Sequence, residues 1–441
     1  MDRFHPSRPI YRYSVLFFVS LLTFGSYFAY DSIGAIAPTL IQALGLDREF
    51  IGQTYTLYSV AAILSVFIGG LLIDRFGTRR ASLLFSALVI LGAFIVAVAP
   101  NTWSLYAGRF VFGWGSESLV VAQSAIFTRW FKGKELAFSF GVGLTISRLG
   151  TLFSFNTEAL IAEYFGDYRA ALWAAVLLCV LSFLANLVYI LLDRRGEKVL
   201  GLHEEGGGGT IILSDVKKFT GSYWYVTLLC VTFYSAIFPF TALSTDFFHD
   251  KWGLPLTAGT EGGFLYQVFY NVLHMFSTAG GTTTIIIFAS MVFAPVFGNL
   301  LDRFGKRATV MLFGSVLMVP AFLTMALTMV PPAIPMVVLG IAFVLVPAAM
   351  WPSIPLIVEK NRVGTAFGLT TTIQNIGLAL FPWLNGALRD ATQAYTASMI
   401  MFSTLGLVGL VFALLLRRSE RGPDAHGLET ITIRSPQPSS A

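Results

Sequence analysis

Charged residues are scarce in this sequence. Asp, Glu, Lys and Arg together make up 12% of the 441 residues, whereas a soluble globular protein carries about a quarter. Hydrophobic residues reach 55%. This balance indicates that water is not the main solvent of the folded chain.

Cysteine is nearly absent, since Cys179 and Cys230 are the only two and both lie inside apolar runs. Neither a disulfide framework nor a thiolate metal site fits such placement. The sequence also lacks a Ser/His/Asp set and a phosphate-binding loop. We therefore expect no enzyme, no metal and no cofactor. The formal charge of +5 is placed at the ends of apolar runs, so nucleic acid is not an expected partner.

Apolar runs of about twenty residues recur along the chain, and each is long enough to cross a hydrocarbon core of about 30 Å. In lipid, continuous runs of this kind form helices, because every backbone polar group must pair within the protein. The first run follows a basic segment, but it is too long for a signal peptide and lacks a cleavage site. The predicted spans are residues 13–37, 53–73, 80–99, 104–128, 135–157, 170–192, 223–245, 282–301, 308–330, 334–357, 364–386 and 393–416.

Basic residues predict the orientation of these spans. Four of the 29 Lys and Arg residues, Arg48, Arg169, Lys251 and Arg389, fall in connections on one side, and Arg109 and Arg148 fall within spans. All the others lie in the two tails and in the connections on the opposite side. The positive-inside rule then places both termini in the cytoplasm.

Composition also predicts the domain boundaries. The polar, Gly-rich segment 193–221 is expected to be a cytoplasmic linker between a bundle of residues 1–192 and a second bundle of residues 222–417. Residues 418–441 are expected to form a disordered cytoplasmic tail. The aromatic segment within residues 247–281 suggests a short interfacial helix on the outer face.

An internal repeat is the strongest signal in the sequence. GGLLIDRFGTRR at residues 69–80 recurs 228 positions later as FGNLLDRFGKRA at residues 297–308, and both copies follow an even-numbered span. A carboxylate beside basic residues at a tight turn can pair with neighbouring helix ends and lock one side shut. We therefore expect gating roles for a set of charged residues in the two copies: Asp74, Arg75, Arg79, Asp302, Arg303 and Arg307.

This spacing of Gly, Asp, Arg and Gly resembles the loop that follows helices 2 and 8 in the major facilitator superfamily. RFVFGWG, with Arg109, Gly113 and Gly115, resembles the pattern on helix 4 of that family, which adds Arg109 to the expected gating residues. The resemblance implies an all-α membrane protein with twelve transmembrane helices in two pseudo-symmetric six-helix bundles. The bundles would rock about a central site near the bilayer midplane.

Two ionisable residues lie well inside predicted spans, where each requires a partner or a task. Glu117 and Arg148 are each some 20 Å from a helix end at 1.5 Å per residue, which places both near the midplane. One interpretation is a structural salt bridge between neighbouring helices. The other is a zwitterion site, in which Glu117 receives an ammonium and Arg148 clamps a carboxylate. The second half has no matching charge pair.

Other polar side chains within the spans have two possible roles. Tyr55 and Tyr58 share one helix face and either line the cavity or anchor near the interface. For Trp351, Gln374 and Asn375 the alternatives are substrate contact or helix packing. Asp31 is placed near the outer end of the first span, as a gate contact or as a simple interfacial residue.

Several further stretches resemble a branch of the superfamily that transports dipeptides in lysosomes and has bacterial relatives. They are FGWGSESL around Glu117, ISRLG around Arg148, IFPF at 237–240, AMWP at 349–352 and GLTTTIQNIGLA from Gly368. The resemblance implies that Glu117 takes the peptide amino terminus and Arg148 the carboxylate. The long connection at 247–281 and the absence of any Asn-x-Ser/Thr sequon depart from this branch. The missing sequon argues against a glycosylated lysosomal protein and favours a bacterial cytoplasmic membrane.

The predicted function is secondary transport of dipeptides or similar short zwitterions by alternating access, with the substrate and the lipid bilayer as partners. Two alternatives remain at this point. One is an exchange of organic anions or drug-like cations for protons through Glu117. The other is a ligand-sensing receptor that keeps the fold without transporting.

Overall fold

The computed structural model describes residues 5–131, 135–201, 213–259, 261–359, 362–423 and 425–431. In chain order its helices are α1 (Pro9–Ser20), α2 (Phe24–Ala35), α3 (Ala37–Leu44), α4 (Arg48–Ala97), α5 (Thr102–Phe131), α6 (Leu136–Phe165), α7 (Tyr168–Leu200), η1 (Leu213–Lys218), α8 (Gly221–Trp252), α9 (Phe264–Leu273), η2 (Met275–Ser277), α10 (Ala279–Phe304), α11 (Arg307–Leu327), α12 (Ala333–Ile357), α13 (Val363–Thr392) and α14 (Thr396–Ser419).

These helices provide the twelve predicted spans. In the described part of the chain, nine are long and apolar enough by themselves to cross a bilayer, with α1 and α2 counted as one. The first half of α4, the helix α10 and the helix α13 complete the set. The predicted all-α fold is confirmed.

Two turn glycines occupy matching positions in the internal repeat. Gly77 has φ 79° and interrupts α4, so that this helix contains two spans. Gly305 has φ 67° and separates α10 from α11. Only glycine adopts this left-handed backbone readily, which explains the same residue in both copies of the motif.

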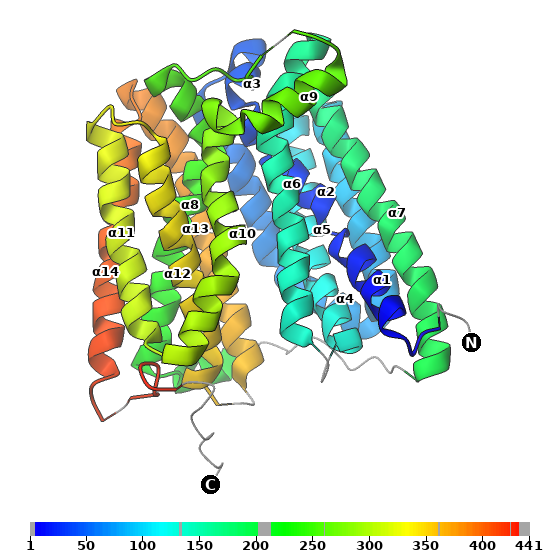
Figure 1. Cartoon of the computed structure of the whole chain (residues 1–441), viewed down its shortest axis with the longest axis vertical. Coiled ribbons are helices and arrows are strands. Elements are labelled where there is room, and N and C mark those ends of the chain that lie inside the picture. Colours follow the sequence, from blue (N-terminus) through cyan, green and yellow to red (C-terminus); the bar gives the residue numbers. More distant parts are fainter. Residues whose placement is uncertain are drawn as a thin grey trace.

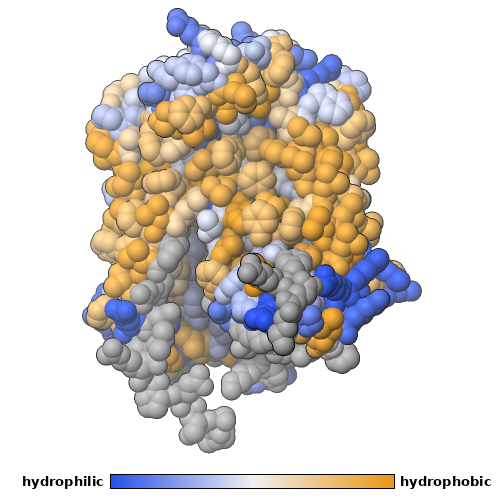
Figure 2. All heavy atoms as spheres, turned by 45° about the vertical axis from the view of Figure 1, so that its right-hand side comes forward, coloured by the Kyte–Doolittle hydropathy of each residue, from blue (hydrophilic) through white to orange (hydrophobic). Residues whose placement is uncertain are grey.

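The chain forms two helical bundles that stand side by side, with α1 to α7 in the first and α8 to α14 in the second (Figure 1). The helix α1 begins and α14 ends on the same side of the molecule, called here the terminal side. The predicted interfacial helix is present as α9, and it lies on the opposite side (Figure 1). On the face drawn in Figure 2, a broad hydrophobic band lies between hydrophilic ends, as a membrane-spanning surface requires.

On the side opposite the termini, α4 of the first bundle packs directly on α13 of the second. A Cβ atom at Gly52 would lie 2.1 Å from the carbonyl oxygen of Pro382, so these backbones approach as closely as glycine permits. The Thr56 hydroxyl donates to the carbonyl of Ala379 at 2.5 Å. The Glu49 backbone N–H donates to Asp390 at 2.7 Å.

Two further helix pairs close the same side. A Cβ atom at Gly34 of α2 would lie 2.9 Å from the carbonyl oxygen of Ala242 on α8. A Cβ atom at Gly280 of α10 would lie 2.2 Å from the carbonyl oxygen of Phe155 on α6. Further hydrogen bonds and an ion pair join the bundles toward this side, while the bundles diverge toward the termini (Figure 1). The structure is therefore the state that is closed opposite the termini.

The segment that carries α9 reinforces this closure. It follows α8 in the second bundle, but Asn271 donates a side-chain hydrogen bond to the carbonyl of Asn156 on α6 of the first. Thr257 donates to the Glu163 carboxylate at 2.7 Å. The rings of Phe264 and Tyr164 lie 5.1 Å apart. This connection thus bridges the two bundles.

The segments expected to be linker and tail are partly ordered. The helix α7 continues to Leu200, and residues 202–212 lie outside the described residues. Within the expected disordered tail, the backbone N–H of Arg307 donates to the carbonyl of Leu428 at 2.9 Å. The Glu429 carboxylate accepts from the backbone N–H of Thr309 at 2.7 Å, which caps the first turn of α11. Residues 425–431 are therefore docked on the second repeat motif.

We predict that Gly52→Val opens the side opposite the termini, because the added side chain cannot fit against Pro382. If the added side chain destabilises the state closed on this side by only about 1.4 kcal/mol, the population ratio of that state to the state open on this side falls tenfold. Spin labels at Arg75→Cys and Arg303→Cys, which are exposed and match in the repeat, should then move to shorter distances by pulsed electron paramagnetic resonance.

The matched control is Gly70→Val, because a Cβ atom at Gly70 meets nothing within 4 Å. It should leave the distance distribution unchanged. Equal distributions in Gly52→Val and wild type would contradict the assignment of the closed side.

Candidate functional site

A cavity of about 310 Å³ lies between the two bundles, below the contacts that close the structure. Its size falls in the range of about 300–1,000 Å³ that is usual for small-molecule sites. The first bundle contributes side chains from α2, α4, α5 and α6, and the second from α8, α10, α12 and α13. The predicted site residues that line it are Asp31, Tyr58, Glu117, Arg148, Trp351, Gln374 and Asn375.

Glu117 projects into this cavity from α5. Its carboxylate accepts a hydrogen bond of 2.7 Å from the Tyr58 hydroxyl of α4. Gly113 and Gly115 on the same helix allow it to approach α4, since Cβ atoms there would lie 2.6 Å from the Tyr58 carbonyl oxygen and 2.7 Å from the Val89 nitrogen. Gly113 and Gly115 thus allow α5 to pack closely on α4, and this packing orients the Glu117 carboxylate.

Arg148 reaches the cavity from α6. Its guanidinium carbon lies 5.2 Å from the ring centre of Phe343, 5.6 Å from that of Phe238 and 5.9 Å from that of Tyr27. Aromatic rings attract a cation without using its N–H donors in hydrogen bonds. The guanidinium is therefore supported from both bundles while its donors face the cavity.

No ion pair joins Glu117 to Arg148, and among the described residues Arg148 forms neither a hydrogen bond nor an ion pair, although Asp31 lies within its electrostatic range on the same cavity wall. The structural salt bridge considered for this pair is absent in this state. Two opposite charges thus face one cavity without neutralising each other directly.

The remaining predicted cavity residues have defined partners. Trp351 donates through its indole N–H to the Tyr234 hydroxyl at 3.0 Å and stacks on Phe367. The Gln374 side-chain oxygen lies 3.5 Å from the Cys230 sulfur. The Asn375 amide donates to the carbonyl of Thr371 at 3.0 Å. These partners fix a wall of the second bundle that is mainly aromatic.

Two predicted positions differ in the structure. Tyr55 does not line the cavity, because its hydroxyl accepts from the backbone N–H of Gly34 and its ring lies under Arg109. Asp31 is not at the outer end of its span but lies buried at the cavity wall. The helix α3 continues the chain beyond α2, and this extension moves Asp31 toward the interior.

Arg109 is enclosed within the first bundle. It is 1% exposed, and its guanidinium donates to the backbone carbonyls of Ala29, Tyr30 and Thr54, each at 3.4 Å. Four aromatic rings surround the charge at 4.9–5.6 Å. These contacts tie α5 to α2 and α4, so in this state Arg109 holds the first bundle together.

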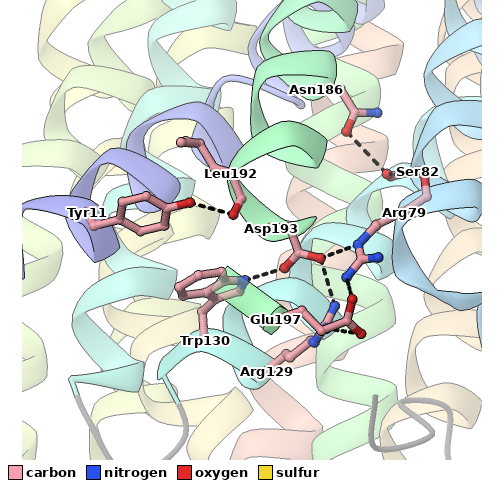
Figure 3. Close-up of polar contacts among 9 residues, drawn as sticks. All are labelled: Tyr11, Arg79, Ser82, Arg129, Trp130, Asn186, Leu192, Asp193 and Glu197. Atoms are coloured by element: carbon pink, nitrogen blue, oxygen red, sulfur yellow. Dashed lines mark hydrogen bonds and ion pairs between the residues drawn. The ribbon is translucent and has the colours of Figure 1, made fainter. Parts of the chain in front are cut away.

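The first repeat motif meets a buried acidic residue on α7. Asp193 is fully buried and accepts from Arg79, from Arg129 at 2.9 Å and from the Trp130 indole at 2.7 Å (Figure 3). Glu197, one turn later, also pairs with Arg79 and Arg129. All of these residues belong to the first bundle, so Arg79 does not reach across to the second in this state.

The other predicted gate residues lie apart on the terminal side. Asp74, Arg75 and Arg303 are exposed. The Arg307 guanidinium donates to the carbonyl of Ile431 in the docked tail at 2.7 Å. The side chain of Asp302 lies outside the described residues. A gating role for these residues stays a prediction.

An ion pair on the closed side was missed from the sequence. Arg48 pairs with Asp246 across the bundles at 2.9 Å, and the Tyr395 hydroxyl donates to the same carboxylate at 2.5 Å. Burial, followed by the charge of Asp246 and the hydrogen bond to it, raises the pKa of Tyr395 well above its ordinary value. Arg389 and Asp250 form a second pair at 3.1 Å within the second bundle.

Two bundles of membrane-spanning helices around one central cavity, closed on one side, define a carrier of the alternating-access class. The family model described as Major Facilitator Superfamily matches residues 19–281 and 263–436. The chain therefore belongs to the major facilitator superfamily.

Curated relatives support a closer placement. The lysosomal dipeptide transporter MFSD1 of Danio rerio is 32% identical over 428 residues, which cover 93% of this chain and 87% of the relative. The Homo sapiens protein of the same name is 32% identical over 435 residues, which cover 95% of this chain and 89% of the relative. In the fold alone, the crystal structure of nucleoside transporter NupG is similar, with a TM-score of 0.71, 13% identity and coverage of 92% of this chain and 99% of that one.

We predict that Asp193→Ala strongly destabilises the protein, because it leaves Arg79 and Arg129 without their shared buried carboxylate. Breaking a buried ion pair costs about 3 kcal/mol or more. The melting temperature of the detergent-purified protein should fall by several degrees.

The control is Glu197→Gln, whose side chain is 42% exposed and which leaves Asp193 in place. It should shift the melting temperature much less. Equal shifts would show that the two carboxylates contribute alike and that burial does not set their importance.

Proposed function

We propose that this protein carries dipeptides or similar short zwitterions across a membrane, held by Glu117 at the ammonium end and by Arg148 at the carboxylate end. The observation that carries the proposal is the uncommitted Arg148 guanidinium, which faces the same cavity as Glu117. A guanidinium forms two parallel hydrogen bonds with a carboxylate. The dipeptide transport named for the curated relatives agrees with this chemistry.

The two charged ends of the proposed site are supported in different ways. Glu117 is oriented by Tyr58, so an ammonium group would meet a fixed acceptor. Arg148 is supported by Phe238 and Phe343 of the second bundle. A carboxylate bound there would be held by one bundle while it lies against rings of the other. Binding would thus stabilise states in which both bundles contact the substrate.

Side-chain tolerance follows from the rest of the wall. Between the two charged positions the cavity presents mainly aromatic and amide groups, among them Tyr234, Trp351, Gln374 and Asn375. This wall of the second bundle offers apolar area and a few hydrogen bonds without a formal charge, and Asp31 on the wall of the first bundle is the further ionisable group. The peptide ends would therefore fix position, and the side chains would contribute little selectivity.

The proposed setting is a bacterial cytoplasmic membrane with both termini in the cytoplasm, supported by the placement of the basic residues. In that orientation the structure is closed toward the outside. The two repeat motifs, with Asp74, Arg75, Arg79, Asp302, Arg303 and Arg307, would then gate the cytoplasmic side. The predicted linker 193–221 would then be shorter, because α7 continues to Leu200, and α1–α7 and α8–α14 would move as two bundles.

The test is ligand-induced thermal stabilisation of the purified protein with dipeptides, amino acids, sugars and organic acids. A ligand at 100 times its dissociation constant adds about 2.7 kcal/mol to the apparent free energy of unfolding. Dipeptides are expected to raise the melting temperature, and dipeptides capped at either end are not. Glu117→Gln and Arg148→Ala should each abolish the shift without lowering the melting temperature of the free protein.

Glu49→Gln provides a matched control, because Glu49 is a carboxylate away from the cavity, at the α4–α13 contact. This variant should keep the dipeptide shift. A wild-type protein that no dipeptide stabilises, or one that capped dipeptides stabilise equally, would contradict the zwitterion site and leave only membership of the family.

A further inference from the structure

The C-terminal segment 425–431, called here the strap, is bound to the start of α11 on the terminal side of the second bundle (Figure 1). The backbone N–H of Arg307 donates to the carbonyl of Leu428 at 2.9 Å, and the Leu428 side chain is fully buried. The Glu429 carboxylate accepts from the backbone N–H and the hydroxyl of Thr309 at 2.7 Å and 2.9 Å. The helix α11 has no side-chain cap of its own at this end. The strap therefore supplies acceptors to N–H groups that a helix start leaves without partners.

The end of α14 anchors the strap. The Glu420 carboxylate accepts from the backbone N–H groups of His426 at 3.1 Å and Leu428 at 2.8 Å. The strap then turns back on itself, because the carbonyl of Gly427 accepts from the backbone N–H of Ile431 at 2.8 Å. It is thus a small folded element with a buried leucine at its centre.

The last helix of each bundle contains a second internal repeat. LLDRRGE at residues 191–197, in α7, recurs as LLLRRSE at residues 414–420, at the end of α14. Leu416 therefore stands where the first bundle has Asp193, and both side chains are fully buried. The second bundle thus has an apolar group at the position of the buried carboxylate of the first.

This exchange gives the matching arginines different partners. Arg79 of the first repeat motif pairs with Asp193. Arg307 occupies the same position in the second repeat motif, and its guanidinium donates to the carbonyl of Ile431 in the strap at 2.7 Å. Asp193 belongs to a long helix and cannot leave without unfolding it. The strap can leave while every span stays folded, so the second repeat motif has a removable partner.

We propose that the strap is an autoinhibitory contact that favours the state open on the terminal side. This inference rests on the gating role proposed for the second repeat motif, but not on which solute is carried. For the terminal side to close, that motif must come to face the first bundle. The docked strap occupies Arg307 and covers the turn at Gly305, where a Cβ atom would lie 3.1 Å from the Glu429 carbonyl oxygen. Release of the strap uncovers the motif and allows the gate to close.

The connection of the strap to α14 makes such control effective. A segment tethered beside its binding site has a high effective concentration there, so a few contacts keep it docked. Docking stabilises only the states that leave its site uncovered, and it shifts the populations by that difference alone. A change in the strap therefore alters the conformational equilibrium without any change in the cavity.

The experiment measures the distance between spin labels at Arg75→Cys and Glu359→Cys by pulsed electron paramagnetic resonance on the full chain without solute. Both positions are exposed on the terminal side, one in each bundle, and the native Cys179 and Cys230 are buried. Leu428→Asp places a charge in a buried apolar site and should release the strap. The population with the shorter distance should then rise at least about fivefold, the lower end of the range for coupled sites.

Ala425→Asp is the matched control, because it adds the same charge at an exposed position of the strap. It should leave the distances unchanged. A chain that ends at Gly422 lacks the strap and should match Leu428→Asp, and it serves the test if that variant does not fold. A label at the exposed Thr430→Cys reports docking directly. Its motion should be restricted in Ala425→Asp and free in Leu428→Asp.

Equal distance distributions in the wild type, in Leu428→Asp and in the shortened chain would refute the proposal. A shift toward longer distances would refute it too, because the strap would then support closure of the terminal side. An equal shift in Ala425→Asp and Leu428→Asp would assign the effect to the added charge and not to release. None of these outcomes depends on dipeptide binding, so a failure of the proposed substrate is distinguishable from a failure of the strap.

Discussion

The site depends on keeping Glu117 and Arg148 apart in a cavity of low dielectric. Direct contact would satisfy both charges and leave little free energy for a ligand, because breaking a buried ion pair is costly. The structure prevents this by giving each charge a different support. Tyr58 holds the carboxylate through a hydrogen bond, and the rings of Phe238 and Phe343 hold the guanidinium without using its donors. The cavity is thus prepared for a molecule that carries both complementary charges.

Much of this architecture could be predicted from the sequence, because hydrophobic length, basic residues and an internal repeat report directly on spans and topology. The cavity was also predictable in part, since Glu117 and Arg148 are charges deep inside apolar runs. The positions of Tyr55 and Asp31 were predicted less well from the sequence. Their positions depend on the packing of α2 against α4 and on the extension α3, which periodicity does not reveal.

Three buried acidic residues show why other parts of the structure could not be predicted from the sequence. Glu158, Asp193 and Asp246 each lie one residue beyond a predicted span that ends at 157, 192 or 245, and all three are at most 3% exposed. A hydrophobic window stops at the first charge and assigns that charge to the interface. The helices in fact continue for about two turns, to the left-handed glycines Gly166, Gly201 and Gly253. Helix-capping glycines would have been the better guide to the ends.

The bridging segment around α9 has a consequence for the speed of transport. Its hydrogen bonds to Asn156 and Glu163 join the bundles only while the side opposite the termini is closed. Each opening must therefore break these hydrogen bonds, and each closing must form them again. The activation enthalpy of opening then includes the loss of these contacts, so the transport rate would depend more steeply on temperature than the motion of two bundles without such a bridge would require.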